Sequence, residues 1–165
     1  MSAILDLAQG LQDSAIGTAL AESTVAFPVI EGIHLLGLSI SVGLIILTDL
    51  RLIGVLFRNL PVADVLRNLR PWVLSGFAVT FLSGFLLFWS EAATVIVSPA
   101  FPVKFLFILL GGLNALYFEF KLAKLTPVVE NHAVLPAGVR YAGLASISLW
   151  TLVIITGRLI PYLPG

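Results

Sequence analysis

The sequence predicts an all-α integral membrane protein, a four-helix up-down bundle preceded by an amphipathic N-terminal helix. Of its 165 residues, 59% are hydrophobic and only 11% are charged, whereas a soluble domain carries about 25% charged residues because its surface must be solvated. Four apolar segments have the length needed to cross a bilayer, and short polar or proline-containing stretches separate them. Short connections between four spans favour antiparallel neighbours.

The same composition excludes several classes of function. The net charge is zero, and no basic run with interleaved aromatic residues occurs, so the sequence predicts no nucleic-acid partner. The chain has no cysteine, which excludes disulfides, thiolate metal sites, iron–sulfur clusters and covalently attached c-type haem. It also lacks a glycine-rich phosphate loop, a Ser/His/acid set and zinc-ligand spacing, and no catalytic residue is predicted.

Residues 1–22 form the first predicted unit, an amphipathic helix. Apolar residues recur there at helical spacing, with acidic and amide side chains elsewhere on the wheel. The segment has no basic n-region and is not expected to be a cleaved signal. Membrane-surface helices usually have a basic polar face. Because this face is acidic, packing against the bundle or a partner fits the pattern at least as well as lying on lipid.

Residues 23–165 form the predicted transmembrane domain. Its spans are expected at about residues 25–57, 71–90, 103–122 and 139–160. Residues 61–69 carry apolar side chains on one face and are expected to form a short separate helix at the interface. Pro71 fits the first turn of the second span, and Trp72 fits headgroup level.

The distribution of basic residues predicts the orientation. One side of the membrane would hold only Lys104 and Arg158. The other side would hold the remaining basic residues, namely Arg51, Arg58, Arg67, Arg70, Lys121, Lys124 and Arg140. By the positive-inside rule the second side is cytoplasmic. We therefore expect a multi-pass protein of the bacterial inner membrane with both termini on the periplasmic side.

Small residues recur four apart in the first two spans, which allows helix backbones to approach closely in lipid. We interpret this spacing as tight helix packing within the chain rather than as a dedicated dimerisation face. The pairs are Gly37 and Ser41, Ser39 and Gly43, Gly76 and Thr80, and Thr80 and Gly84.

Glu31 and His34 are the polar residues of the first span that could carry chemistry. They are three apart and share one helix face, and His34 lies about 10 Å along the axis from Phe27. Ionisable residues at such depth are candidates for function. Arg158 is expected at similar depth on the fourth span, so one interpretation is a Glu31–Arg158 ion pair with His34 hydrogen-bonded nearby.

The alternative is that His34 ligates b-type haem or a metal, because membrane four-helix bundles with inward histidines hold haem. The second histidine, His132, lies in the cytoplasmic connection, most of a bilayer away. A bis-histidine haem within one chain is therefore not expected. His34 would be a single axial ligand or would pair with a ligand from another subunit.

Four charged residues are expected at the cytoplasmic end, where antiparallel helices would bring the first and third spans together. We expect them to form ion pairs that fix the register of the helices, because residues two apart on one helix cannot face each other. These residues are Asp49, Arg51, Glu119 and Lys121.

Several short motifs resemble a family of small, uncharacterised bacterial four-helix membrane proteins. They are Glu31-Gly32-Ile33-His34-Leu35-Leu36-Gly37, Asp49-Leu50-Arg51-Leu52-Ile53-Gly54, Pro71-Trp72 and Pro99-Ala100-Phe101-Pro102-Val103-Lys104. The plan is also distantly similar to copper-resistance D-type membrane domains and to small b-type cytochromes. The resemblance implies a fold and a notable histidine. Glu119 stands where the family pattern often has a histidine, so a second histidine-dependent site does not carry over.

The leading hypothesis is a non-catalytic accessory or interaction subunit of a membrane assembly, in contact with lipid and with other subunits or a second copy. Two alternatives stay open. One is a b-type cytochrome-like electron carrier with His34 as a haem ligand. The other is passage of an ion or copper through the bundle, with Glu31 and His34 at its entrance.

Overall fold

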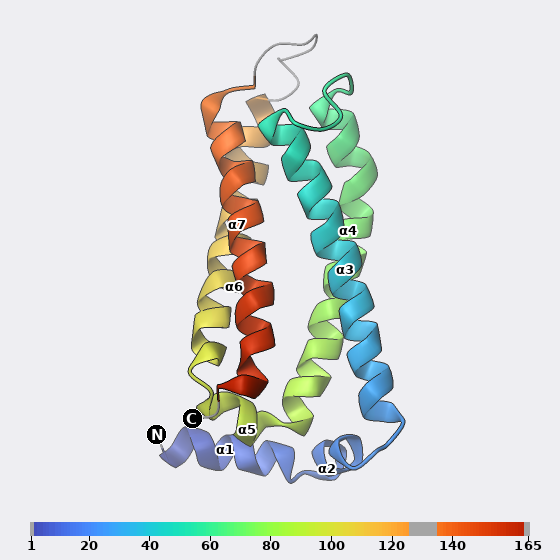
Figure 1. The fold of residues 1–165 in the computed structure, drawn as a ribbon, viewed down its shortest axis with the longest axis vertical. Helices are drawn as coiled ribbons and strands as arrows, with labels where there is room; N and C mark the ends of the chain where they lie inside the picture. Colours follow the sequence, from blue (N-terminus) through green and yellow to red (C-terminus); the bar gives the residue numbers. More distant parts are fainter. Residues whose placement is uncertain (1, 126–134, 164–165) are drawn as a thin grey trace.

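Four long helices dominate the computed structural model, which describes residues 2–125 and 135–163. They are α3 (Ala26–Ile53), α4 (Val62–Ser90), α6 (Ala100–Tyr117) and α7 (Ala137–Leu159), and they run alternately up and down (Figure 1). A π-helical turn, Phe118–Leu122, extends α6, and single 3-10 turns follow at Ala123–Leu125 and Ile160–Tyr162. All four long helices are apolar enough to cross a membrane. The described residues therefore confirm the predicted helical bundle.

Three short helices, α1 (Ser2–Gln12), α2 (Ala15–Ala21) and α5 (Ala92–Val97), lie across one end of the bundle (Figure 1). We call this the terminal end, because α3 begins and α7 ends there. The opposite end, where α6 ends, α7 begins and residues 54–61 lie, is the loop end.

The long helices pack as two pairs, α3 with α4 and α6 with α7, and α3 also packs against α7 (Figure 1). The closest backbone packing thus runs in the order α4, α3, α7, α6. An apolar cluster centred on Val42, Trp150 and Val153 fills the middle of the bundle. A second cluster, centred on Leu52, Leu122 and Val139, fills the loop end.

Small residues bring α3 and α4 together, as their spacing predicted. A Cβ atom on Gly76 would lie 2.9 Å from the backbone nitrogen of Ser41, and one on Gly37 would lie 2.8 Å from Oγ1 of Thr80. The two helices therefore touch through backbone and hydroxyl groups. Gly43 takes no part, because no neighbouring atom lies within 4 Å of the position its Cβ would occupy.

The element boundaries differ from the predicted ones at three places. α3 ends at Ile53 and not near Phe57, because Gly54 adopts the left-handed conformation (φ 87°) that closes a helix. Residues 61–69 do not form a separate helix; they are the first turns of α4, which continues through Pro71. A proline is tolerated inside a membrane helix because neighbouring groups satisfy the freed backbone. Helix α5 was not predicted.

The predicted amphipathic N-terminal helix is present as two helices that pack against the bundle. Ser14 separates them, because its hydroxyl accepts a hydrogen bond from the Gly17 nitrogen (3.2 Å) and caps α2. Trp89 of α4 holds this junction: its Nε1 donates to the Leu11 carbonyl oxygen (3.0 Å) and to the Ser14 hydroxyl (2.9 Å). Helix α1 packs against α5, and α2 packs against α4.

Trp89→Phe should loosen α1 and α2 without unfolding the bundle. Phenylalanine keeps most of the apolar contact but loses the indole donor, and a hydrogen bond contributes about 1 kcal/mol to stability. We expect faster amide hydrogen exchange in residues 3–21 and unchanged exchange in the four long helices. Trp72→Phe is the matched control, since Trp72 is 65% exposed. Equal exchange in both variants would contradict the assigned role of Trp89.

Candidate functional site

His34 is held between α3 and α4 in a defined orientation. Its Nδ1 lies 2.9 Å from the backbone carbonyl oxygen of Thr80 and 3.1 Å from the hydroxyl oxygen of Ser83. A carbonyl oxygen can only accept, and the Ser83 hydroxyl donates to the Val79 carbonyl oxygen (2.6 Å). Nδ1 therefore carries the proton, and in the neutral ring the lone pair is on Nε2.

Gly84 allows this close approach of the imidazole to α4. A Cβ atom on Gly84 would lie 2.9 Å from Cε1 of His34, so any larger residue would push the ring away. Sequence reasoning singled out Thr80 and Gly84 only for helix packing and did not connect either of them with His34. The group of Thr80 that contacts His34 is its backbone carbonyl oxygen. Every residue has such an oxygen, so the sequence does not indicate this contact.

Charged residues from two helices lie near His34 at the terminal end. Lys104 of α6 and Glu31 of α3 both act on it electrostatically. The Nζ and Cε atoms of Lys104 are each 3.4 Å from the position that a Cβ on Gly157 of α7 would take, so Lys104 lies against α7. The sequence had indicated Lys104 only as a marker of orientation. The site thus combines an oriented imidazole, an ammonium and a carboxylate.

Glu91, at the junction of α4 and α5, extends this charged set. Burial raises the pKa of the Glu91 carboxyl above its ordinary value of 4.5, and the negative charge of Glu31 raises it further. The folded protein therefore binds this proton more tightly than the unfolded chain does. A cation from outside the chain would reduce the repulsion between Glu31 and Glu91 and would favour the charged form of both.

The raised pKa of Glu91 predicts a loss of stability as pH rises. A carboxyl whose pKa is higher in the folded than in the unfolded chain contributes stability that is complete below the unfolded pKa, near 4.5, and is lost as pH passes the folded pKa. Thermal unfolding in detergent between pH 4 and pH 7 should show this decline. Glu91→Gln should remove the part of this decline in stability that the Glu91 carboxyl causes. An identical pH profile in the variant would contradict the assignment.

Arg158 does not join this cluster through an ion pair with Glu31, as one interpretation of the sequence expected. Its Nη2 donates to the Tyr162 hydroxyl (3.3 Å), and its guanidinium lies 5.5 Å from the centroid of the same ring. Tyr162 lies one helical turn after Arg158 and offers both contacts locally. Among the described residues, the ion pairs are Arg67–Asp64 and Arg70–Glu119, both at the loop end.

The loop-end ion pairs expected of Asp49, Arg51 and Lys121 are absent from the described part of the chain. Arg51 Nε donates to the Leu60 carbonyl oxygen (2.8 Å). Glu119 does pair, but with Arg70 of α4 (2.7 Å). The packing order separates α3 from α6, and the side chain of Arg70 reaches Glu119 from α4 instead.

Asp49 is the exceptional residue of the loop end. It is only 5% exposed, and its Oδ2 has no hydrogen-bond partner. The backbone oxygen of Asp49 is 3.2 Å from the position of a Cβ on Gly143 of α7, so the residue lies in the tight α3/α7 contact. A buried polar group without a partner is costly. Asp49 also has a side-chain hydrogen bond with Ser146 of α7, so the unpartnered Oδ2 is the costly part of this interface.

The polar groups of the two ends are not joined through the bundle. Val42, Trp150 and Val153 and the side chains packed on them lie between His34 and Asp49. Within residues 2–125 and 135–163, no three His, Cys, Asp or Glu side chains gather as a metal-binding set would. His132 lies outside the described residues.

Comparison with protein-family models matches residues 15–163 to a family described as a family of unknown function, DUF6644. Neither a curated protein nor a solved structure matches the chain. The resemblance to an uncharacterised family is thus confirmed. The comparisons give no support to the distant similarity with copper-resistance D-type domains and small b-type cytochromes.

Proposed function

The chain belongs to the DUF6644 family of unknown function, and we propose that it is an accessory subunit of a membrane assembly that receives its partner at the terminal end. Its four apolar helices make it a multi-pass membrane protein. The basic residues concentrated in the connections of the loop end support an orientation with that end in the cytoplasm. In this orientation the terminal end faces the periplasm of a bacterial inner membrane.

The observation that carries this proposal is the set of charges without ion pairs at the terminal end. Among the described residues, none of Glu31, Glu91 and Lys104 forms an ion pair, and Nε2 of His34 has no hydrogen bond. Both described ion pairs lie at the other end. Charged groups near hydrocarbon are expensive unless they are paired. Complementary groups of a partner subunit, or of a second copy, would pair them and would select that partner.

The size of the gently extracted protein tests this proposal. After extraction in digitonin, native electrophoresis should show the chain in a complex larger than a monomer. The double variant E31Q/K104Q should release the monomer, whereas R140Q, which changes an exposed residue of the loop end, should not. A wild-type protein that migrates only as a monomer would overturn the proposal.

A second candidate is a b-type haem protein, and the orientation of His34 favours it. Histidines that ligate a metal usually donate their other ring N–H to a backbone carbonyl or carboxylate, and His34 donates to the Thr80 carbonyl in this way. Haem would supply one-electron redox chemistry. Among the described residues His34 would be the single histidine ligand, either as the one axial ligand or together with a ligand from another subunit. This agrees with an accessory role.

An absorption spectrum of the purified protein tests the haem hypothesis. A Soret band that disappears in H34A while the helical circular dichroism is retained would support His34 as the ligand. H132A is the matched control, because it removes the other histidine and should leave the band unchanged. The absence of a Soret band in both the oxidised and the reduced wild-type protein would exclude the hypothesis.

Passage of an ion or copper is the third hypothesis from the sequence. It requires a polar route between His34 and the loop end. The apolar cluster around Val42 and Trp150 separates these positions, so the observed packing gives no support to a route. We therefore place this hypothesis behind the other two.

A further inference from the structure

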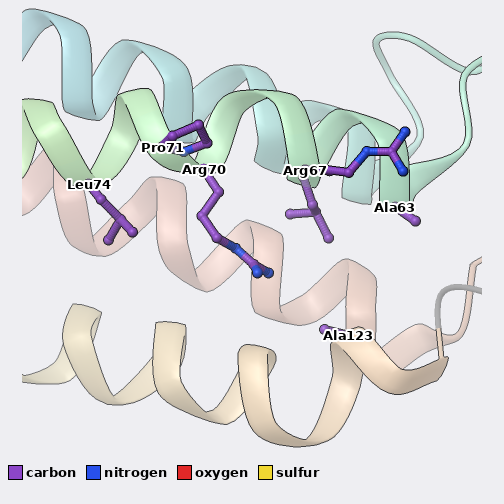
Figure 2. Close-up of a pocket in the computed structure, with 7 residues that line it drawn as sticks. Ala63, Arg67, Arg70, Pro71, Leu74 and Ala123 are labelled. Carbon is purple, nitrogen blue, oxygen red and sulfur yellow. The ribbon is translucent and has the colours of Figure 1, made fainter.

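Helices α4 and α6 face each other across a groove at the loop end (Figure 2). The backbone packing order places these two helices at opposite ends of the row, so side chains connect them. Near the terminal end the rings of Phe88 and Phe101 stack, with centroids 5.5 Å apart. Towards the loop end the groove encloses about 480 Å³.

The inner part of this groove is apolar. Leu66, Pro71 and Leu74 of α4 and Ala123 beyond α6 line it. The Leu74 side chain points from α4 towards α6 (Figure 2) and is 61% exposed. The neighbouring Trp72 is 65% exposed, as expected for a tryptophan at a membrane interface. We expect such an apolar surface to contact the acyl chains of lipids.

The rim of the groove is basic. Arg70 reaches from α4 towards α6 (Figure 2) and bonds Glu119 through Nη2 at 2.7 Å, yet its side chain is 47% exposed. Arg67 pairs with Asp64 at 2.8 Å and is 76% exposed. A guanidinium has five N–H donors, so each arginine keeps donors for another anion. The exposed Lys121 and Lys124 flank Ala123 in the sequence and add basic charge to the loop end.

Along α4 the basic residues come first and the apolar residues follow, which matches the order of headgroup and acyl chains in a phospholipid. Leu74 follows Arg70 by four residues, which is about 6 Å along the helix axis towards the membrane interior. We infer that the groove binds an anionic phospholipid of the leaflet at the loop end. Arg70 holds its phosphate, Arg67 adds positive charge at the rim, and one acyl chain lies along Leu66 and Leu74. Basic pockets between membrane helices bind anionic headgroups in this manner.

Lipid binding to the purified full chain tests this inference. Native mass spectrometry in detergent should show retention of dioleoylphosphatidylglycerol in preference to dioleoylphosphatidylcholine. Each arginine near a membrane surface is worth about a fivefold change in affinity for anionic lipid. R67Q should therefore weaken binding of the phosphatidylglycerol about fivefold and R67Q/R70Q about 25-fold, while R158Q at the terminal end should not change it.

The variant E119Q separates lipid binding from the structural role of the Arg70–Glu119 pair. It breaks the ion pair but leaves the charge of Arg70 available, so phosphatidylglycerol binding should be equal to or tighter than that of the wild type. A loss in E119Q as large as that in R67Q/R70Q would overturn the inference, as would equal retention of the two lipids. No retained lipid, or a partner protein that alone fills the groove, would overturn it as well.

Discussion

Replacing Gly76 with valine is expected to lower the free energy of unfolding by about 1–3 kcal/mol, because overpacking a tight contact forces the backbone apart. Even the first side-chain atom would lie 2.9 Å from the Ser41 nitrogen and 3.1 Å from the Ser41 Cα. Both are atoms of the α3 backbone, which cannot rotate away as a side chain can. The α3/α4 contact would therefore have to open.

Gly43→Val is the matched control for Gly76→Val. It makes the same substitution in α3, where nothing lies within 4 Å of the new Cβ. Unfolding by sodium dodecyl sulfate in mixed micelles, followed by circular dichroism, measures both. Gly76→Val should unfold at a lower detergent fraction than Gly43→Val. Equal transitions would show that the close α3/α4 crossing does not contribute to stability.

Asp49→Asn is expected to raise the free energy of unfolding by about 1–3 kcal/mol. The carboxylate is 5% exposed and its Oδ2 has no partner, and a buried unsatisfied polar group costs about that much, more if it is charged. Asparagine has nearly the same shape and no charge, so it removes the burial of a negative charge, keeps an oxygen for the hydrogen bond with Ser146, and leaves no cavity.

The control for Asp49→Asn is Asp64→Asn, which removes the carboxylate of an exposed pair with Arg67. Exposed ion pairs contribute about 0–1 kcal/mol, so this variant should be neutral or slightly destabilised. The same detergent titration measures both. A destabilised Asp49→Asn would mean that the carboxylate is needed in the fold, for instance to hold a cation or a partner group.

The sequence predicted the architecture well because lipid imposes it. Each span must be helical and apolar, and the segments holding Glu31, Pro71, Lys104 and Arg158 follow this rule. The helix order around the bundle was not predictable in the same way. The first and third spans are not neighbours in the packing order, and only the packing shows that Glu119 pairs with Arg70 and not with Arg51.

The candidate site was predicted in part. His34 stood out as an imidazole in an apolar helix, but its acceptor is the Thr80 carbonyl oxygen, which any residue at that position would supply. The contact of Arg158 with Tyr162 follows from a spacing of four residues and could have been anticipated. The proximity of Lys104 to Gly157 depends on the α6/α7 contact, and nothing in the sequence indicates it.

Site-specific photo-crosslinking in intact membranes tests the partner-binding role of the terminal end most directly. A photoreactive residue in place of Glu91 would probe the terminal end, and one in place of Arg140 would probe the loop end. We predict a discrete protein adduct from position 91, lost in E31Q/K104Q, and none of that size from position 140. No adduct from position 91, or the same adduct from both positions, would contradict the account.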